Sequence, residues 1–456
     1  MSSTQEVGPI FGKGEGPAQA LLRSPTVIIL SIGLWGMNIF FFRLFKLDYV
    51  QILNLDLVKE RQALLVSSDD ASEKSSALEQ KSSSGSAFSL VIPFGSRITA
   101  TKCIGLSVVL LCLLHLSEYI WVDIHGGSTL GAIFIFYASV CFIFLLPLAS
   151  TRWMRIATSL VFQRTFELIR PRCSCITQPI HGPRPIPFID VFYADAMCSL
   201  SKVFFDWGML FHMATFYPNP VPKSLWSIFI PSFCAAIPYL IRARQCLIMY
   251  TVGRIKHDPK RYQHLLNALK YCSSIFPICL SAYQQTLKPK RAKSLEGLLL
   301  VLMVINATYA LAWDIIMDWG MFQDPTVVAQ YACTAPSDSP PKVQSCGHAL
   351  MRPKLRFGIT ASASIALADT VLRFSWLLRF RMSLFPSKDH FVLATQLLEA
   401  FRRAIWNLLR VEWESIKHNK ARQQEDNDDD EVAPFFKPPS TLQMSQISNG
   451  SQNMLL

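Results

Sequence analysis

Charged residues are scarce in this sequence of 456 residues. They make up 17% of the chain, whereas soluble domains carry about 25%. Hydrophobic residues reach 51%. A soluble protein of this length could bury a large core, so composition alone does not decide the class. The length of the uninterrupted apolar runs has to decide it.

Enzyme motifs are also lacking. The chain contains no His-Glu-x-x-His zinc helix, no Gly-x-Ser-x-Gly nucleophile elbow and no P-loop, and its nine histidines are scattered. We therefore predict no enzymatic activity, no cofactor and no metal site. The twelve cysteines are scattered as well, many of them inside apolar runs. Cys333 and Cys346 share the polar loop 321–355, and they can pair if that loop is luminal, which the sequence leaves open.

Long apolar runs indicate a membrane protein. A helix needs about 20 apolar residues to cross the hydrocarbon core of a bilayer. Several runs meet or approach that length, and they are 26–42, 104–117, 126–151, 224–241, 271–287 and 297–313, with shorter runs at 357–368 and 391–398. We predict an all-α, polytopic membrane helical bundle with eight to ten transmembrane segments.

The net charge of +12 is concentrated in groups of Lys and Arg between these runs. On a soluble protein such a charge would indicate nucleic acid. Here the positions fit helix ends and loops, so the predicted partner is the lipid bilayer and not nucleic acid.

The runs divide the chain into four parts. The first run lacks a small-residue cleavage site and is interpreted as an anchor and not as a cleaved signal peptide. Segment 153–170 is amphipathic and fits either the membrane interface or a tilted span. The predicted parts are a disordered N-terminus at 1–24, N-terminal transmembrane helices at 25–180 with a Ser-rich loop at 66–90, a membrane domain at 181–420, and a disordered acidic, Pro-containing tail at 421–456.

Ionisable residues recur within the later spans, although each costs about 2.5–3.5 kcal/mol to insert and therefore normally faces an interior cavity. Asp314 and Asp318 lie four residues apart, on one face of a helix. The stretch 188–217 adds Asp190, Asp195, Lys202 and Asp206.

Two further pairs, Asp369 with Arg373 and Glu399 with Arg403, have the spacing of plain intrahelical ion pairs, and that structural alternative stays open for each. If their helices pack together, however, Lys270, Arg373, Arg402 and Arg403 lie close to one another. A cluster rich in Arg suits an oxyanion, because the guanidinium fork donates two hydrogen bonds to it.

Six motifs in order resemble the EXS domain, the membrane domain of the xenotropic-retrovirus-receptor family of phosphate exporters. They cover about residues 185–415 and begin at Phe188-Ile-Asp-Val-Phe-Tyr-Ala-Asp, Arg244-Gln-Cys-Leu, His264-Leu-Leu-Asn-Ala-Leu-Lys-Tyr, Trp313-Asp-Ile-Ile-Met-Asp-Trp-Gly, Leu372-Arg-Phe-Ser-Trp and Glu399-Ala-Phe-Arg-Arg-Ala-Ile-Trp-Asn. The resemblance implies a set of phosphate-pathway residues: Asp195, Ser201, Lys270, Tyr271, Asp314, Asp318, Arg373, Trp376, Glu399, Arg402 and Arg403. Cys198 stands where the exporters have Asn, which puts fine substrate preference in question.

The family's exporters usually begin with an SPX domain, and the first apolar run near residue 26 leaves no room for one. This departure resembles the short EXS proteins, similar to the fungal "ER retention defective" protein of the Golgi. The resemblance implies a multi-pass protein of the Golgi membrane, with the ER or plasma membrane as alternatives. It would return luminal phosphate from glycosylation to the cytosol, support retention of Golgi glycosyltransferases and form a homodimer.

A different function class stays open: a sorting receptor or adaptor that binds coat proteins or glycosyltransferase tails without transport. In that case the charges of the EXS region would be structural.

Overall fold

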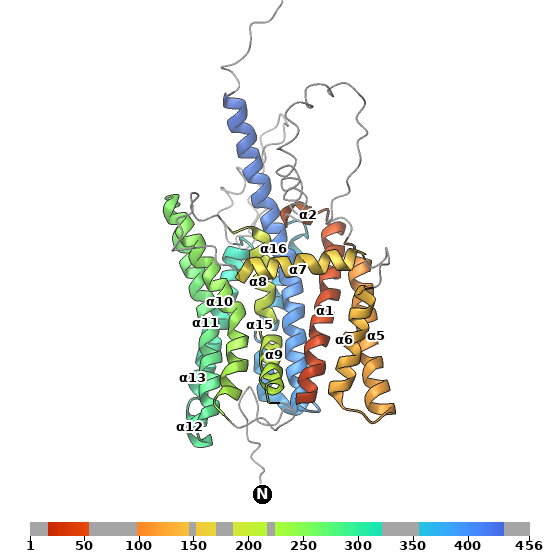
Figure 1. Ribbon diagram of the computed structural model, residues 1–456. Helices are drawn as coiled ribbons and strands as arrows, with labels where there is room; N and C mark the ends of the chain where they lie inside the picture. Colours follow the sequence, from red (N-terminus) through yellow and green to blue (C-terminus); the bar gives the residue numbers. More distant parts are fainter. Residues whose placement is uncertain are drawn as a thin grey trace, which may run out of the picture.

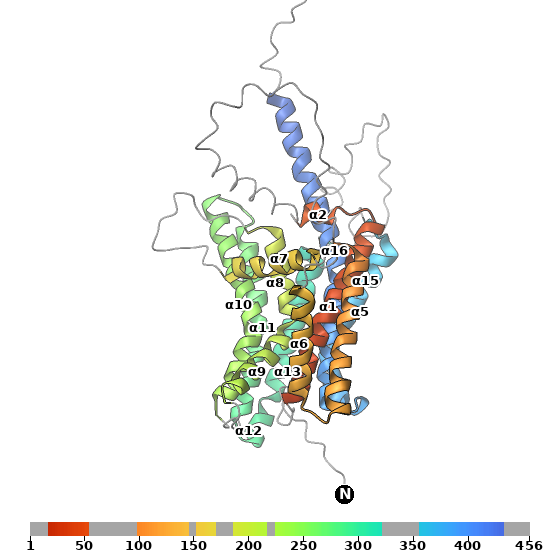
Figure 2. The same ribbon diagram turned by 45° about the vertical axis from the view of Figure 1, so that its right-hand side comes forward.

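The computed structural model describes residues 17–53, 98–145, 152–169, 186–216, 224–321 and 355–432. All regular structure in these ranges is helical, and the chain is an all-α polytopic membrane protein, as predicted. The long helices run side by side as a bundle (Figures 1 and 2). The Ser-rich loop, Cys333 and Cys346 lie outside the described residues.

The N-terminal part forms one side of the bundle. Its helices are α1 (Pro17–Leu44), α2 (Tyr49–Ile52), α5 (Ala100–Glu118), the π-helical turn η1 (Tyr119–Ile124), α6 (Thr129–Leu145) and α7 (Arg152–Ile169). α1 packs on α5 and also on α16 (Lys388–Val432), the last helix of the bundle. α1 and α5 approach each other closely at Gly36. A Cβ at this position would lie only 3.0 Å from the Ala100 carbonyl oxygen. Small residues serve this purpose in membrane helices.

The remaining helices surround the polar interior of the bundle. They are α8 (Phe188–Ser199), α9 (Ser201–Ala214), α10 (Trp226–Ile255), α11 (Arg261–Thr286), α12 (Pro289–Ser294), α13 (Glu296–Trp313), the π-helical turn η3 (Asp314–Asp318), α15 (Ile359–Arg373) and the 3₁₀ segment η4 (Ser375–Leu384). α10 packs against α9 and α11, and α16 packs against α1 and α15.

Five described helices are long and apolar enough to cross a membrane, and a sixth is counted if the bent pair of α15 and η4 forms one span. The predicted count of eight to ten is not confirmed. α6 is apolar but short, and α8 and α9 are separated by a break at Leu200. The apolar run at 391–398 lies within α16, whose many charged residues lower its mean hydropathy.

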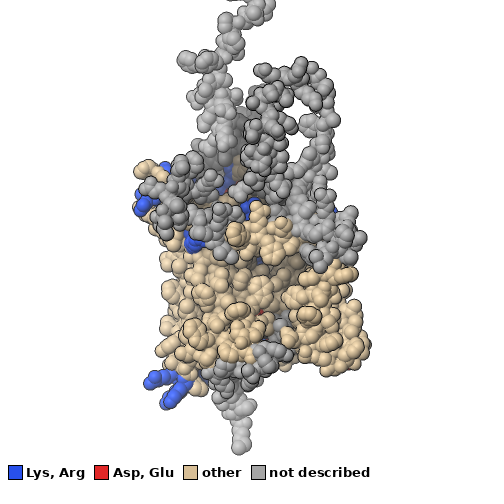
Figure 3. All heavy atoms as spheres, in the orientation of Figure 1, with Lys and Arg blue, Asp and Glu red and all other residues tan. Residues whose placement is uncertain are grey.

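The surface agrees with a bilayer around the bundle. Figure 3 shows an uncharged band around the middle of the molecule, with basic side chains gathered at both ends. Many of the exposed large hydrophobic residues lie on the long helices, for example Phe233, Phe276 and Val304. α7 lies across the bundle, roughly perpendicular to the long helices (Figure 1), which matches the interfacial interpretation of that segment.

The helix boundaries differ from the predicted ones at both ends. α1 begins at Pro17, inside the segment 1–24 that was expected to be disordered, and α16 continues to Val432, past residue 420. The first part of the second extension, 421–425, consists of Ala, Arg, Gln and Glu, which are good helix formers, whereas the Asp and Asn residues at 426–430 are weaker ones.

Candidate functional site

A cavity of about 530 Å³ lies inside the bundle, between α8, α9, α11, α13, the α15–η4 pair and α16. All eleven residues that the sequence predicts line it, which places five of the six motifs around one space. They are Asp195, Ser201, Lys270, Tyr271, Asp314, Asp318, Arg373, Trp376, Glu399, Arg402 and Arg403.

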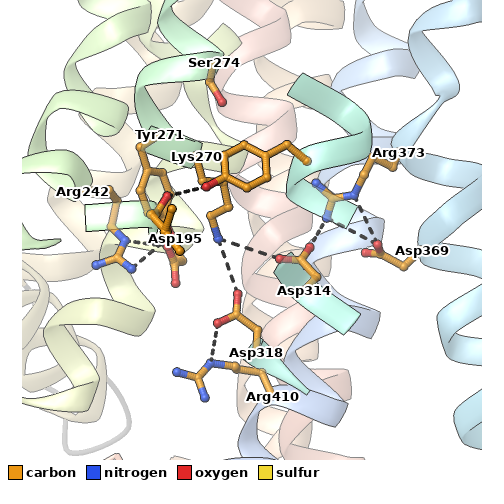
Figure 4. A network of polar contacts seen from close by, with 12 residues as sticks. Asp195, Arg242, Lys270, Tyr271, Ser274, Asp314, Asp318, Asp369, Arg373 and Arg410 are labelled. Atoms are coloured by element: carbon orange, nitrogen blue, oxygen red, sulfur yellow. Dashed lines mark hydrogen bonds and ion pairs between the residues drawn. The ribbon is translucent and has the colours of Figure 1, made fainter. Parts of the chain in front are cut away.

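Lys270 stands at the centre of the polar network (Figure 4). Its Nζ lies 3.9 Å from Asp314 Oδ1 and 3.5 Å from Asp318 Oδ2, and Arg410 Nε lies 3.8 Å from the other oxygen of Asp318. Both aspartates belong to the π-helical turn η3, not to a regular α-helical face. Single π-helical turns are frequent at functional sites.

Arg373 and Arg402 are held by three carboxylates. Arg373 contacts Asp314, and its Nη2 lies 3.4 Å from Asp369 Oδ2. Arg402 Nη1 donates to Asp369 Oδ1 at 2.9 Å, and its Nε and Nη2 donate to Glu399 at 2.8 and 2.6 Å. The Asp369–Arg373 pair is therefore intrahelical, as its spacing allows, but it belongs to a network that joins three segments.

Arg403 is bonded differently from its neighbours. The i,i+4 pair with Glu399 is not formed, because Glu399 pairs with Arg402 instead. Arg403 Nε donates to Ser199 Oγ at 2.8 Å, and its guanidinium lies 4.3 Å from the centroid of the Trp406 ring. Among the residues that the structure describes, no carboxylate forms an ion pair with Arg403. Arg403 is thus a basic side chain of the cavity that an anion can approach without displacing an acid.

Asp195 and Tyr271 belong to a second group, which the sequence analysis left incomplete. Asp195 Oδ1 accepts from the Tyr271 hydroxyl at 2.7 Å and from Arg242 Nε at 2.6 Å. Arg242 was missed, although an arginine within a 30-residue helix of apolar character is itself a signal. The uncharged run ends at Ile241, but α10 continues past it to Ile255 and so includes Arg242.

Two breaks in the helices lie beside the cavity. Leu200 separates α8 from α9, and Phe374 separates α15 from η4; both adopt φ −94° and ψ 13°. The second break bends the pair by 60°. The neighbours of each break line the cavity, with Ser199 and Ser201 at the first and Arg373 and Ser375 at the second. Broken helices of this kind form the substrate sites of many transporters, near the middle of the membrane.

The lining favours an anion in charge and in hydrogen-bonding capacity. Its eight basic side chains (Arg23, Lys202, Lys270, Arg373, Arg379, Lys388, Arg402 and Arg403) exceed its five acidic ones (Asp195, Asp206, Asp314, Asp318 and Glu399). The buried donors Trp376 Nε1, Trp406 Nε1 and Ser281 Oγ also line it and have no hydrogen-bond partner. The Ser201 hydroxyl, by contrast, is already bonded to the Ala235 carbonyl at 2.7 Å.

A second polar group lies toward the end of the bundle where α1 and α16 begin. Arg23 donates to Asp206 through Nε at 3.0 Å and through Nη2 at 2.5 Å. Gln396 Nε2 donates to the same carboxylate at 3.3 Å, and Lys202 Nζ donates to Thr395 Oγ1 at 2.8 Å. We call Arg23, Lys202, Asp206, Thr395 and Gln396 the Asp206 layer, and all five line the cavity. Lys202 and Asp206 were noted from the sequence as charges within a span, but the other three were missed.

The described part of the chain contains no group of three His, Cys, Asp or Glu placed to hold a metal ion.

Comparison with known proteins gives one matching family and several relatives. A profile described as the EXS family matches residues 18–416. Protein ERD1 homolog 1 of Schizosaccharomyces pombe is 30% identical over 239 residues, which is 50% of this chain and 58% of that protein.

Two further relatives are longer. Human Solute carrier family 53 member 1 is 27% identical over 321 residues, and the Xenotropic and polytropic retrovirus receptor 1 homolog of Danio rerio is 26% identical over 313 residues. Both alignments cover 64% of this chain and 41% of the relative. The chain thus spans about half of the length of the curated relatives that it matches.

Proposed function

Because this chain belongs to the EXS family, we propose that it transports inorganic phosphate across the Golgi membrane, from the lumen to the cytosol. The phosphate would be the by-product of glycosylation, and its return would support the retention and recycling of Golgi glycosyltransferases. The Golgi location rests on the resemblance to the short EXS proteins and on the similarity to Protein ERD1 homolog 1.

The observation that carries the transport proposal is the convergence of Lys270, Arg373, Arg402 and Arg403 on one cavity. We call these four residues and the acids Asp195, Asp314, Asp318 and Glu399 the arginine cluster. Guanidinium groups bind tetrahedral oxyanions through paired N–H donors, and the unpartnered indole N–H groups of Trp376 and Trp406 add donors without charge. A donor-rich, positively charged interior fits phosphate as a cargo.

The acids of the arginine cluster also have a place in this mechanism. Asp314, Asp318 and Glu399 neutralise Lys270, Arg373 and Arg402, whose charges would otherwise be buried without a partner. Asp195 pairs with Arg242. An arriving phosphate replaces part of these contacts, so binding is an exchange of anions and stays weak enough for release. The breaks at Leu200 and Phe374 give the walls of the cavity points at which they can bend.

The direct test is uptake of radiolabelled phosphate by proteoliposomes that contain the purified protein. We expect Arg403→Ala to lower the initial rate at least about tenfold, because a charge-assisted hydrogen bond contributes about 1.5–3 kcal/mol. Arg244→Ala is the matched control, because Arg244 lies on α10 outside the cavity lining and donates to the Leu168 carbonyl at 3.1 Å. Wild-type vesicles without uptake above protein-free vesicles would refute the transport proposal.

A truncation separates transport from sorting. Removal of residues 425–456 deletes most of the acidic tail and leaves the cavity intact. We expect cells with this variant to retain both phosphate transport and Golgi glycosyltransferases, and cells with Arg403→Ala to lose both. Lost retention together with intact transport in the truncated variant would favour the sorting-receptor function.

A further inference from the structure

The Asp206 layer contains a buried hydrogen-bond acceptor, the side-chain oxygen of Gln396, that takes no part in the arginine cluster. Gln396 is 3% exposed, and its Oε1 has no hydrogen-bond partner while its Nε2 donates to Asp206 Oδ2 at 3.3 Å. The orientation of this amide is determined by chemistry, because a carboxylate only accepts hydrogen bonds and must therefore face the NH₂ group. Gln396 Oε1 is thus a buried acceptor in the wall of the cavity.

A cation lies in the same layer as this acceptor. Lys202 Nζ donates to Thr395 Oγ1 at 2.8 Å, and Thr395 is the neighbour of Gln396 on α16. Lys202 lies one turn before Asp206 on α9, so α9 and α16 face each other through two successive polar contacts. Thr395 is itself 3% exposed, and Lys202, Thr395 and Gln396 all line the cavity.

We propose that Lys202 and Gln396 form a second oxyanion station, which selects hydrogenphosphate over sulfate. It lies roughly 10 Å along α16 from Arg403, because Arg403 follows Gln396 by seven positions and an α-helix rises about 1.5 Å per residue. The inference rests on the proposed phosphate transport and adds to it a residue that determines specificity.

The selection follows from the protons of the two anions. Near neutral pH hydrogenphosphate keeps a P–OH group and can donate to Gln396 Oε1, whereas sulfate has no proton to donate. Sulfate in this station would leave the buried oxygen without a partner and would press one of its own oxygens against it. An unsatisfied buried acceptor costs about 1–3 kcal/mol, enough for discrimination of about tenfold or more.

The arginine cluster does not make this distinction through its basic residues. Guanidinium and ammonium groups only donate hydrogen bonds, so they bind hydrogenphosphate and sulfate alike. Its carboxylates can accept a hydrogen bond from phosphate, but Asp314, Asp318 and Glu399 are engaged by Lys270, Arg373 and Arg402. Gln396 Oε1 needs no such exchange.

The test compares phosphate uptake by proteoliposomes in the presence of increasing sulfate. We expect Gln396→Met, which keeps the size of the side chain and removes the acceptor, to lower the sulfate concentration that halves uptake about tenfold. Gln284→Met is the matched control, because Gln284 is also buried, at 6% exposed, but donates to the Ala292 carbonyl outside the cavity lining.

Calorimetric titration of the same detergent-solubilised proteins with phosphate and with sulfate separates this inference from the transport proposal. Wild-type protein should bind phosphate more tightly than sulfate, and Gln396→Met should bring the two affinities together. Equal phosphate-to-sulfate ratios in wild type and Gln396→Met would overturn the station, even if uptake is normal. A normal preference in binding without any uptake would overturn transport and keep the station.

Discussion

The arginine cluster sets four basic side chains against four acidic ones, whereas the five residues of the Asp206 layer include two basic side chains and one carboxylate. Neutral groups complete the layer: Thr395 accepts from Lys202, and Gln396 donates to Asp206. The comparison separates two tasks that one cavity must perform. Balanced charges bind and release an anion by exchange, while neutral groups in fixed orientation can recognise where its proton lies.

Removing one basic residue from the arginine cluster should have the largest effect on stability. Arg402→Met removes the shared partner of Asp369 and Glu399, and it leaves the fully buried Asp369 with the longer contact to Arg373, at 3.4 Å. Breaking a buried pair in this way costs about 3–5 kcal/mol. We expect a marked drop in the thermal unfolding temperature in detergent, together with loss of phosphate uptake.

Arg403→Met is the control that separates the effect on stability from the effect on phosphate uptake. Arg403 bonds to Ser199 and contacts Trp406 without an ion pair, so its loss should lower phosphate uptake as strongly but cost less stability. Equal destabilisation by the two substitutions would show that Arg402 and Arg403 have the same structural role, and that Arg403 is not held available for phosphate.

Breaking the central ion pair of the Asp206 layer should have an intermediate effect. Asp206→Asn removes the charge that faces Arg23, but Asp389 remains 3.4 Å from Arg23 Nη1 and the new amide oxygen still accepts. We therefore expect a loss of about 2 kcal/mol in the free energy of unfolding. Denaturant unfolding of the reconstituted wild-type and variant proteins measures this difference in free energy.

The double variant Arg23→Met with Asp206→Leu tests whether the charges of this pair matter beyond stability. Apolar replacement of a buried ion pair is often neutral or stabilising, so stability should return to near the wild-type value. Full recovery of stability with altered sulfate sensitivity would assign the pair to positioning Gln396. Failure of the double variant to recover would mean that the packing between α1 and α9 depends on the pair itself.

The smallest effect is expected at Tyr271. Tyr271→Phe removes the hydroxyl that donates to Asp195 Oδ1 at 2.7 Å and accepts from Arg242 Nη2 at 3.0 Å, while Arg242 still pairs with Asp195. A loss of about 1 kcal/mol is expected. Tyr309→Phe, at a hydroxyl that donates to the Leu266 carbonyl near the surface, should cost less in the same thermal unfolding measurement.

Sequence reasoning found the arginine cluster because charges inside apolar helices are costly and must face inward. It could not choose between Arg402 and Arg403 as the partner of Glu399, since both spacings occur on one helix face and the neighbouring helices decide. Gln396 gave no signal, because an uncharged polar residue is tolerated at many positions of a helix. Arg23 was placed in an N-terminus expected to be disordered, and only the packing of α1 on α9 shows its role.

The number of spans was harder to predict than the site. Hydropathy measures the length of an apolar run, but it does not show whether the helix continues. The break at Leu200 divides a membrane segment without a Pro or Gly to mark it, and Phe374 does the same between Arg373 and Ser375. The resemblance to the EXS family, confirmed over residues 18–416, supplied what local patterns lacked.

α16 carries residues of both regions on one uninterrupted helix, from Thr395 and Gln396 to Glu399, Arg402 and Arg403. The spacing between the two stations is therefore as rigid as the helix itself, whereas the opposite walls can bend at Leu200 and Phe374. α16 therefore fixes the distance between the two sites while the opposite walls of the cavity can bend. A phosphate ion that crosses the protein would meet these two sites about 10 Å apart, one recognising its proton and the other its charge.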